Sequence, residues 1–471
     1  RASSNCSPRL RFGWRAVSAP IPGALKMDMD HIDPELRRFY EEEDYEDIDL
    51  NHEVWTNFGA CTEGTLNSVA KMMAKTIFSA LLIRLIAATR LSYNKKQYLV
   101  VILGIAQIYY SDLSRQAKFQ VVTALPFFAF LLTRTYLQGP EFPSLLTSAL
   151  FLLMVILEFK QVHNFGEFRG MMMIMTMKLS SLAFDLTENK YHASCKEAMA
   201  FLFSPATFFF GPALTLPAFR AAFTPQTLRE HLFSVLKGSL YLLLSLVCVV
   251  FSSCVPQLLY PKGPLIADFS YAQSFRVSHY FMCYWSQGLV TLAGEAAPPI
   301  VGALSVEFPR SFSIIVSVWN TPMHRYLYDY IYSRLKPEGP AVSIIGTFFV
   351  SALFHGLNGQ LSAVLLSLGL LCYAESQLRT RLSVRLSLCV GSRECRPNCG
   401  HKYKGRTVRA RTANLLFTLV NIYLLIYLGM PFDDSAQGEG YPVLYTLRVW
   451  KRHYFAGHLV TLAYLLTSVA I

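Results

Sequence analysis

The chain has 471 residues, of which 53% are hydrophobic and only 16% are charged, whereas about a quarter of the residues in a typical soluble protein are charged. The formal net charge is +12, although residues 28–53 hold 12 acidic residues against two arginines. This composition excludes an ordinary soluble domain. In a membrane protein, basic residues typically lie in cytosolic loops and near anionic lipid, so we expect the lipid bilayer as a partner and no nucleic acid.

Residues 1–60 are expected to form a disordered extension. Met27 resembles a natural start, and residues 1–26 lack the long apolar core of a secretory signal. The acidic block at residues 28–53 is typical of a solvated, disordered run, and a recruitment segment is the alternative. We therefore predict a structured membrane domain over residues 61–471.

Twelve apolar runs follow, and a helix that crosses a bilayer needs roughly 20 residues. Several runs are shorter, which indicates re-entrant or broken helices whose backbone is satisfied by protein or by a water-filled cavity. The prediction is an all-α, multi-pass bundle with about 10–12 membrane helices. The runs are 69–91, 97–111, 118–137, 144–160, 170–185, 197–216, 234–258, 278–294, 341–355, 360–377, 412–430 and 453–471.

Two of these runs contain features that depart from a simple membrane helix. Phe210-Gly211-Pro212 predicts a break in the 197–216 run, because proline cannot donate to a helix. Lys178 and Asp185 lie on one face of the 170–185 run. They are interpreted either as anchors at the helix end, with Lys178 reaching the membrane surface, or as a pair lining a tunnel.

The candidate catalytic residues are His355 and Asn320. Residues 341–354 are almost wholly apolar and end at His355-Gly356, and an ionisable side chain at the end of a membrane helix is by default a candidate functional residue. Trp319-Asn320-Thr321-Pro322 supplies an amide 35 residues upstream. A histidine satisfied by a neighbouring carbonyl is the structural alternative. Common nucleotide-binding, serine-hydrolase and zinc-protease motifs are absent from the sequence.

Residues 377–411 are predicted to be a cytosolic loop, since they hold ten Lys or Arg and one acid, Glu394. This orientation places His355 near the midplane or in the lumenal half. The loop contains four soft ligands in a C-x5-C-x3-C-x-H pattern: Cys389, Cys395, Cys399 and His401. They are a weak zinc candidate, with free thiols or palmitoylation sites as the alternatives.

The other cysteines suggest no dense disulfide framework. Four of them lie inside apolar runs and are interpreted as small core residues: Cys248, Cys254, Cys283 and Cys372.

The order of several motifs resembles the membrane-bound O-acyltransferase family. These are Phe210-Gly211-Pro212, Glu307-Phe-Pro-Arg310, Trp319-Asn320-x-Pro322 and Ser351-Ala-Leu-Phe-His355-Gly356. The resemblance covers the chain from about residue 70 onwards. It is most specific between residues 300 and 420, where the S-x-W-N-x-P-M stretch, the cysteine pattern and R-x-x-N-L-L-F (Arg411–Phe417) are similar to members that acylate Wnt proteins.

The resemblance implies a multi-pass enzyme of the endoplasmic reticulum membrane. Such an enzyme transfers a monounsaturated long-chain acyl group, palmitoleoyl, to a Wnt serine and so supports Wnt secretion and signalling. Palmitoleoyl-CoA would be the co-substrate in an apolar tunnel, with no tightly bound cofactor. His355 falls on the family's active-site histidine, and Asn320 falls on its second catalytic position.

The chemistry of acyl transfer suits these side chains. A neutral imidazole can accept the serine proton, and an Asn amide can donate to the developing oxyanion. Trp319, Pro322, Ser351 and Gly356 are predicted to shape the substrate pocket, and Gly356 would let the substrate approach the backbone. The alternatives are acylation of a lysophospholipid, a sterol or another secreted protein, and a transporter or scaffold with a structural histidine.

Overall fold

The computed structural model describes residues 50–135, 139, 141–160, 165–261, 263–356, 358–396, 398–432 and 442–471. These residues are overwhelmingly helical, and the β-type pairing among them is an isolated bridge between Leu388 and Tyr403. The predicted all-α fold is therefore confirmed.

The first half of the described chain contains one very long helix, several of membrane length and a group of short ones. They are α2 (Leu50–Ala88), α3 (Tyr93–Tyr110), α4 (Arg115–Thr135), α5 (Phe142–Phe159), α6 (Phe165–Thr187), α7 (Cys195–Leu202), α8 (Pro205–Phe208), α9 (Leu216–Arg220), η2 (Ala221–Phe223) and α10 (Leu228–Leu258).

The second half repeats this mixture of long and short helices. It contains α11 (Pro264–Ala293), α12 (Ala303–Glu307), α13 (Phe312–Trp319), α14 (Thr321–Leu327), η3 (Tyr328–Tyr332), α15 (Ser333–Leu335), η4 (Lys336–Glu338), α16 (Pro340–Phe354), α17 (Gly359–Arg385), α18 (Val408–Gly429), α19 (Val443–Arg452) and α20 (Ala456–Ala470).

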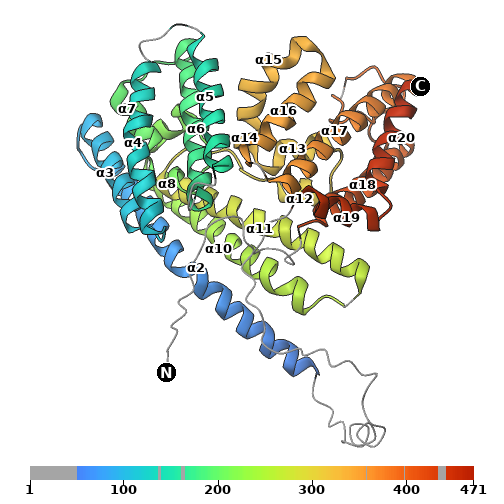
Figure 1. Cartoon of the computed structure of the whole chain (residues 1–471), viewed down its shortest axis with the longest axis horizontal. Helices are drawn as coiled ribbons and strands as arrows, with labels where there is room; N and C mark the ends of the chain where they lie inside the picture. Colours follow the sequence, from blue (N-terminus) through green and yellow to red (C-terminus); the bar gives the residue numbers. More distant parts are fainter. Residues whose placement is uncertain are drawn as a thin grey trace, which may run out of the picture.

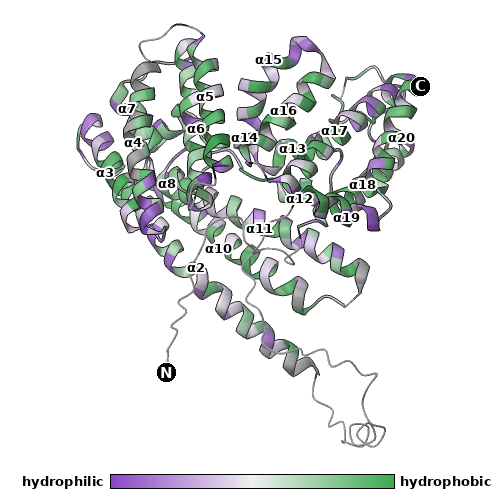
Figure 2. Cartoon of the chain, in the orientation of Figure 1, coloured by the Kyte–Doolittle hydropathy of each residue, from purple (hydrophilic) through white to green (hydrophobic). Residues whose placement is uncertain are grey.

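The surfaces of these helices are apolar enough for a bilayer. By length and composition, α5, α10, α17 and α18 can each cross a membrane, and α16 and α20 are shorter apolar helices. Figure 2 shows hydrophobic colour along the helices, with hydrophilic residues mainly near their ends. Large apolar side chains are more than half exposed on many helices, and such a surface is typical of contact with lipid. They include Phe78, Leu85, Ile102, Leu152, Leu236, Leu240, Leu243, Leu415, Leu419, Leu462 and Leu466.

Two predicted boundaries are wrong. Helix α2 begins at Leu50, so residues 50–60 belong to the helical domain rather than to the predicted extension; residues 1–49, with the acidic block up to Asp49, lie outside the described residues. Helix α17 continues to Arg385, which shortens the predicted 377–411 loop to residues 386–407. The helix continues because buried Arg379 pairs with Glu375 one turn earlier at 2.7 Å, so these charges are satisfied inside the protein.

The break predicted within the 197–216 run is confirmed. The run is divided into α7, α8 and the start of α9, and Gly211 has a φ of +74°. The run at 453–471 also differs from a single helix, since α19 ends at Arg452 and α20 begins at Ala456. The short helices α12–α15 carry mixed polar and apolar residues over too few turns for a periodic pattern to reveal them.

Figure 1 shows α2, α10 and α11 running diagonally below two groups of helices, α3–α8 at the left and α13–α20 at the right. The helices α10 and α11 can pack closely because Gly288 on α11 has no side chain. A Cβ at this position would lie only 2.6 Å from the Leu242 side chain on α10.

A disulfide joins Cys61 on α2 to Cys254 on α10. All four cysteines interpreted as small core residues are buried; Cys254 forms this disulfide, whereas Cys248, Cys283 and Cys372 are free. Residues 50–60, which precede the predicted start of the domain at residue 61, thus belong to α2, the helix that this disulfide holds to α10.

Lys178 and Asp185 are both buried but do not pair with each other. The Lys178 ammonium donates to Phe201 O at 2.8 Å and to the Thr207 hydroxyl, and the residue is 1% exposed. Lys178 therefore does not reach the membrane surface. Asp185 accepts hydrogen bonds from Lys190, Tyr191 and Tyr330, which anchor the end of α6 to the following loop and to η3.

Candidate active site

The end of α16 fixes the backbone position of His355. The His355 N–H donates to Ala352 O at 3.1 Å, and Gly356 then turns the chain with a φ of +86°, a conformation that favours glycine. Phe354 is fully buried, with its ring 4.0 Å from that of Phe151 on α5 and 5.6 Å from that of Tyr326 on α14. These contacts fix the last turn of α16, and His355 lies half-buried immediately after it.

The imidazole of His355 has no hydrogen-bond partner among the residues that the structure describes. This arrangement differs from the predicted structural alternative, a histidine satisfied by a neighbouring carbonyl. An imidazole held by its backbone, with both ring nitrogens unengaged by the described residues, can exchange a proton with a substrate.

An ion pair supports the backbone of His355. Arg169 on α6 lies 3.2 Å from Glu158 on α5 and donates to His355 O at 2.6 Å. A Cβ at Gly356 would lie 2.1 Å from Glu158 Oε2 and 2.3 Å from Arg169 Nη1. The sequence suggested that a substrate would come close to the Gly356 backbone. In the structure the side chains of Glu158 and Arg169 occupy the space beside this glycine. Sequence analysis missed both residues, because they lie on helices far from His355 in the chain.

Replacing Arg169 with Gln is expected to slow acyl transfer about tenfold, the equivalent of about 1.4 kcal/mol in the barrier. The reason is that the His355 carbonyl loses its charged donor, so the imidazole is held less firmly. The check is the acyl-transfer rate of the purified variant together with its thermal unfolding. Arg448→Gln, at an exposed position on α19, is the matched control. An unchanged rate in Arg169→Gln would show that the ion pair does not position His355.

Asn320 lies between two short helices, at the end of α13 and at the N-cap of α14. Its Oδ1 accepts from Met323 N at 3.1 Å, and its backbone O accepts from His324 N at 2.9 Å. Because Oδ1 is engaged as the cap, the amide orientation is set and Nδ2 remains as the donor. The junction is held from outside by Thr321 N, which donates to Ile300 O at 2.8 Å.

A second histidine, His279 on α11, connects these elements. Its ring stacks on Trp319, with centroids 4.3 Å apart and planes 3° apart, and Nε2 donates to Trp319 O at 2.9 Å. His279 thus ties α11 to the Trp319–Asn320 turn. Sequence analysis missed it, since one histidine within a membrane helix gives no sign of its partner.

The remaining predicted residues have different positions. Pro322 is buried in the first turn of α14, and Ser351 is buried one turn before His355 on α16. Cys389, Cys395, Cys399 and His401 gather in the α17–α18 loop, as a cluster apart from these side chains. The motif residues Glu307 and Arg310 have structural partners: Glu307 pairs with Arg276 at 2.9 Å, and Arg310 donates to Cys389 O and Gly391 O.

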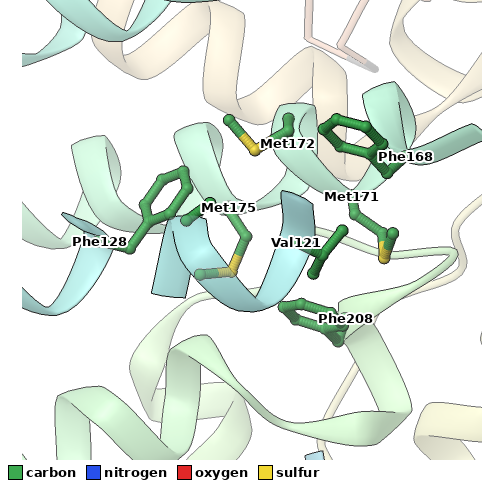
Figure 3. Close-up of a pocket in the computed structure, with 8 residues that line it drawn as sticks. Val121, Phe128, Phe168, Met171, Met172, Met175 and Phe208 are labelled. Carbon is green, nitrogen blue, oxygen red and sulfur yellow. The ribbon is translucent and has the colours of Figure 1, made fainter. Parts of the chain in front are cut away.

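An apolar cavity lies between α4, α6 and α8 (Figure 3). Its lining includes Phe128, Phe168, Phe208 and three methionines of α6: Met171, Met172 and Met175. It offers about 10 Å³ to a water-sized sphere, which is about the room that one water molecule needs. An acyl chain would fit only if these side chains moved. Methionine is the side chain that repacks most readily.

The helical fold and the lipid-facing surface define a multi-pass membrane protein, and the His355 imidazole at the end of an apolar helix is a candidate base for acyl transfer. A family model of membrane-bound O-acyltransferases matches residues 58–384. The chain belongs to the membrane-bound O-acyltransferase family.

Curated relatives are similar over most of this region. The protein-serine O-palmitoleoyltransferase porcupine of Mus musculus is 33% identical over 353 residues, which cover 67% of this chain and 76% of the relative. The protein of the same name from Homo sapiens gives the same values. That from Caenorhabditis briggsae is 30% identical over 318 residues, which cover 65% of this chain and 71% of the relative.

Proposed function

We propose that this enzyme transfers a palmitoleoyl group from palmitoleoyl-CoA to a serine of Wnt proteins at the endoplasmic reticulum membrane. The observation that carries the proposal is the His355 imidazole, held at the end of the apolar helix α16 and free of hydrogen bonds from the described residues. The similarity to porcupine proteins supports the acyl group and the serine acceptor, since their names state both.

In the proposed reaction His355 is the general base. It takes the proton of the acceptor serine as the serine oxygen attacks the thioester carbonyl. The resulting tetrahedral oxyanion accepts a hydrogen bond from Asn320 Nδ2. When the carbon–sulfur bond breaks, the CoA thiolate leaves and takes the proton from the His355 imidazolium, so His355 returns to its neutral form.

The residues around this pair have supporting roles in the proposal. Trp319, Ser351 and Pro322 shape the pocket, and His279 holds the Trp319 ring and carbonyl directly before Asn320. Gly356 makes the turn that lets Arg169 reach the carbonyl of His355. In the proposal, the acyl chain lies in an apolar tunnel between helices. The methionine-lined cavity beside α6 forms part of this tunnel once its side chains move apart.

The test is acyl transfer by the purified full chain in detergent. The substrates are palmitoleoyl-CoA and a disulfide-closed Wnt hairpin peptide that carries the acceptor serine, and the product is measured by mass spectrometry. The proposal predicts one palmitoleoyl group per peptide and none on the matching serine-to-alanine peptide. Acylation of a lysophospholipid or a sterol, with none of the peptide, would keep the acyl-transfer chemistry and overturn the acceptor.

A further inference from the structure

We propose that the α17–α18 loop is a structural zinc site with Cys389, Cys395, Cys399 and His401 as its four ligands. The proposal concerns residues outside the proposed catalytic pair, and its primary test does not depend on acyl transfer. It rests on the arrangement of the ligand atoms, on the hydrogen bond that fixes the histidine, and on what the loop holds in place.

Three of the six distances between the ligand atoms already match the edges of a tetrahedral zinc site. The Sγ atoms of Cys389 and Cys399 are 3.4 Å apart, and His401 Nδ1 lies 3.6 Å from Cys389 Sγ and 3.7 Å from Cys395 Sγ. All four atoms lie within 4.8 Å of one another. Zinc bonds of about 2.3 Å to sulfur and 2.0–2.1 Å to nitrogen give tetrahedral edges of about 3.5–3.8 Å. A disulfide needs sulfurs about 2.0 Å apart, so the cluster is not a formed disulfide.

The histidine presents its ligand nitrogen to the thiols. The Ser383 hydroxyl donates its single hydrogen to Leu388 O at 2.9 Å, so at 3.0 Å from His401 Nε2 it can only accept. Nε2 therefore carries the proton, and Nδ1 keeps a free lone pair beside the sulfurs of Cys389 and Cys395. Metal-binding histidines commonly use one nitrogen as a ligand and donate the other N–H to a supporting group.

The charges and packing of the loop suit a thiolate-bound cation. Three thiolates around Zn²⁺ leave one net negative charge, and Lys404 Nζ lies 3.7 Å from Cys399 Sγ. Cys389 is buried with Leu388, Val390 and Ala410 in a small apolar cluster. The loop is basic and joins α17 to α18 at the upper right of Figure 1, whereas the N-terminal part of α2, which the Cys61–Cys254 disulfide joins to α10, is the lowest helical segment in that view. Reduced cysteines in the α17–α18 loop are expected if this loop faces the reducing cytosol, and the Cys61–Cys254 disulfide is expected if that end of α2 faces the oxidising lumen.

The loop also holds the start of α13, which gives a bound metal a structural role. Arg310 donates to Cys389 O and Gly391 O at 3.2 Å each, and Ser311 donates to Ser392 O at 2.9 Å. Arg310 and Ser311 directly precede α13, whose eight residues end at Trp319, next to Asn320. An eight-residue helix is about 12 Å long. One short helix thus separates the cysteine cluster from the Trp319–Asn320 turn.

The experiment is metal analysis of the full chain, purified in detergent without added metal or chelator. Mass spectrometry of the metals should find about one zinc per chain, and a mercurial that blocks thiols should release it. The double variant Cys395→Ser/Cys399→Ser should hold less than about a tenth of that zinc. Cys195→Ser, which removes an exposed cysteine of α7, is the matched control and should keep the full amount.

The wild-type measurement decides the proposal even if the double variant fails to fold. A metal-free wild-type chain whose three loop cysteines are alkylated under native conditions would overturn it. An acyl chain on one of these cysteines, a disulfide between two of them, or a metal other than zinc at one per chain would also overturn it. Cobalt taken up by the metal-depleted chain should give the visible bands of a tetrahedral thiolate site, and their absence would count against the proposal.

Discussion

His355→Ala is expected to lower the rate of palmitoleoyl transfer to the serine peptide by about 10²–10⁴-fold, the contribution typical of a positioned general base. The fold should survive, because no hydrogen bond among the described residues depends on the imidazole, whereas the Arg169 contact is to the backbone carbonyl and persists. The measurement is single-turnover acyl transfer at matched protein concentration, with thermal unfolding of both proteins in the same detergent.

His192→Ala is the matched control for that measurement, since His192 is exposed and lies in the loop before α7. Free imidazole added to His355→Ala should restore part of the activity if the lost group is a base. Turnover equal to that of the parent chain would remove His355 from the mechanism. A variant that unfolds at much lower temperature would instead indicate a structural role.

Asn320→Asp is expected to lower the transfer rate by about 10²–10³-fold, the cost of removing one oxyanion donor. Aspartate is as good an N-cap as asparagine, so α14 should keep its first turn and the chain its stability. Asn320→Ala removes the Met323 cap as well and should cost about 1 kcal/mol of stability in addition to the lost activity. The measurement compares rate and thermal unfolding for both variants and for Asn320→Ser, which keeps a cap without the amide donor.

The three Asn320 variants separate two roles of one side chain. If Asn320 donates to the oxyanion, all three lose activity and only the alanine variant also loses stability. If Asn320 serves only as a helix cap, the aspartate and serine variants keep the parent rate. An aspartate variant that stays active while serine does not would indicate that the carboxyl or amide oxygen orients the substrate.

Much of the fold follows from local sequence. The apolar runs predicted the long helices, because a bilayer requires each buried backbone group to be satisfied within its own segment. Phe210-Gly211-Pro212 predicted the broken helix for a similarly local reason. The predicted start of the domain at residue 61 lies 11 residues after the true start of α2 at Leu50. The local sequence could not show this start, because the first part of α2 is held to the bundle by a disulfide between residues 193 positions apart.

The candidate site shows the same division. His355 and Asn320 could be proposed from sequence, because a histidine at the end of an apolar helix and an asparagine before a proline are each unusual within their own segment. Arg169, Glu158 and His279 could not be found in that way. Each resembles an ordinary helix residue until the fold brings it to the His355 carbonyl or the Trp319 ring.

The sequence by itself therefore determined the helical membrane class, the family resemblance and the two residues proposed for the chemistry, since these depend on patterns within single segments. Only the tertiary structure decided that Lys178 is buried rather than at the surface, that Glu158 and Arg169 fill the space beside Gly356, and that the three loop thiols gather with His401 in one cluster. The physical reason is that hydrogen bonds, ion pairs and ligand sets join side chains from distant helices, and their geometry exists only when the helices are packed together.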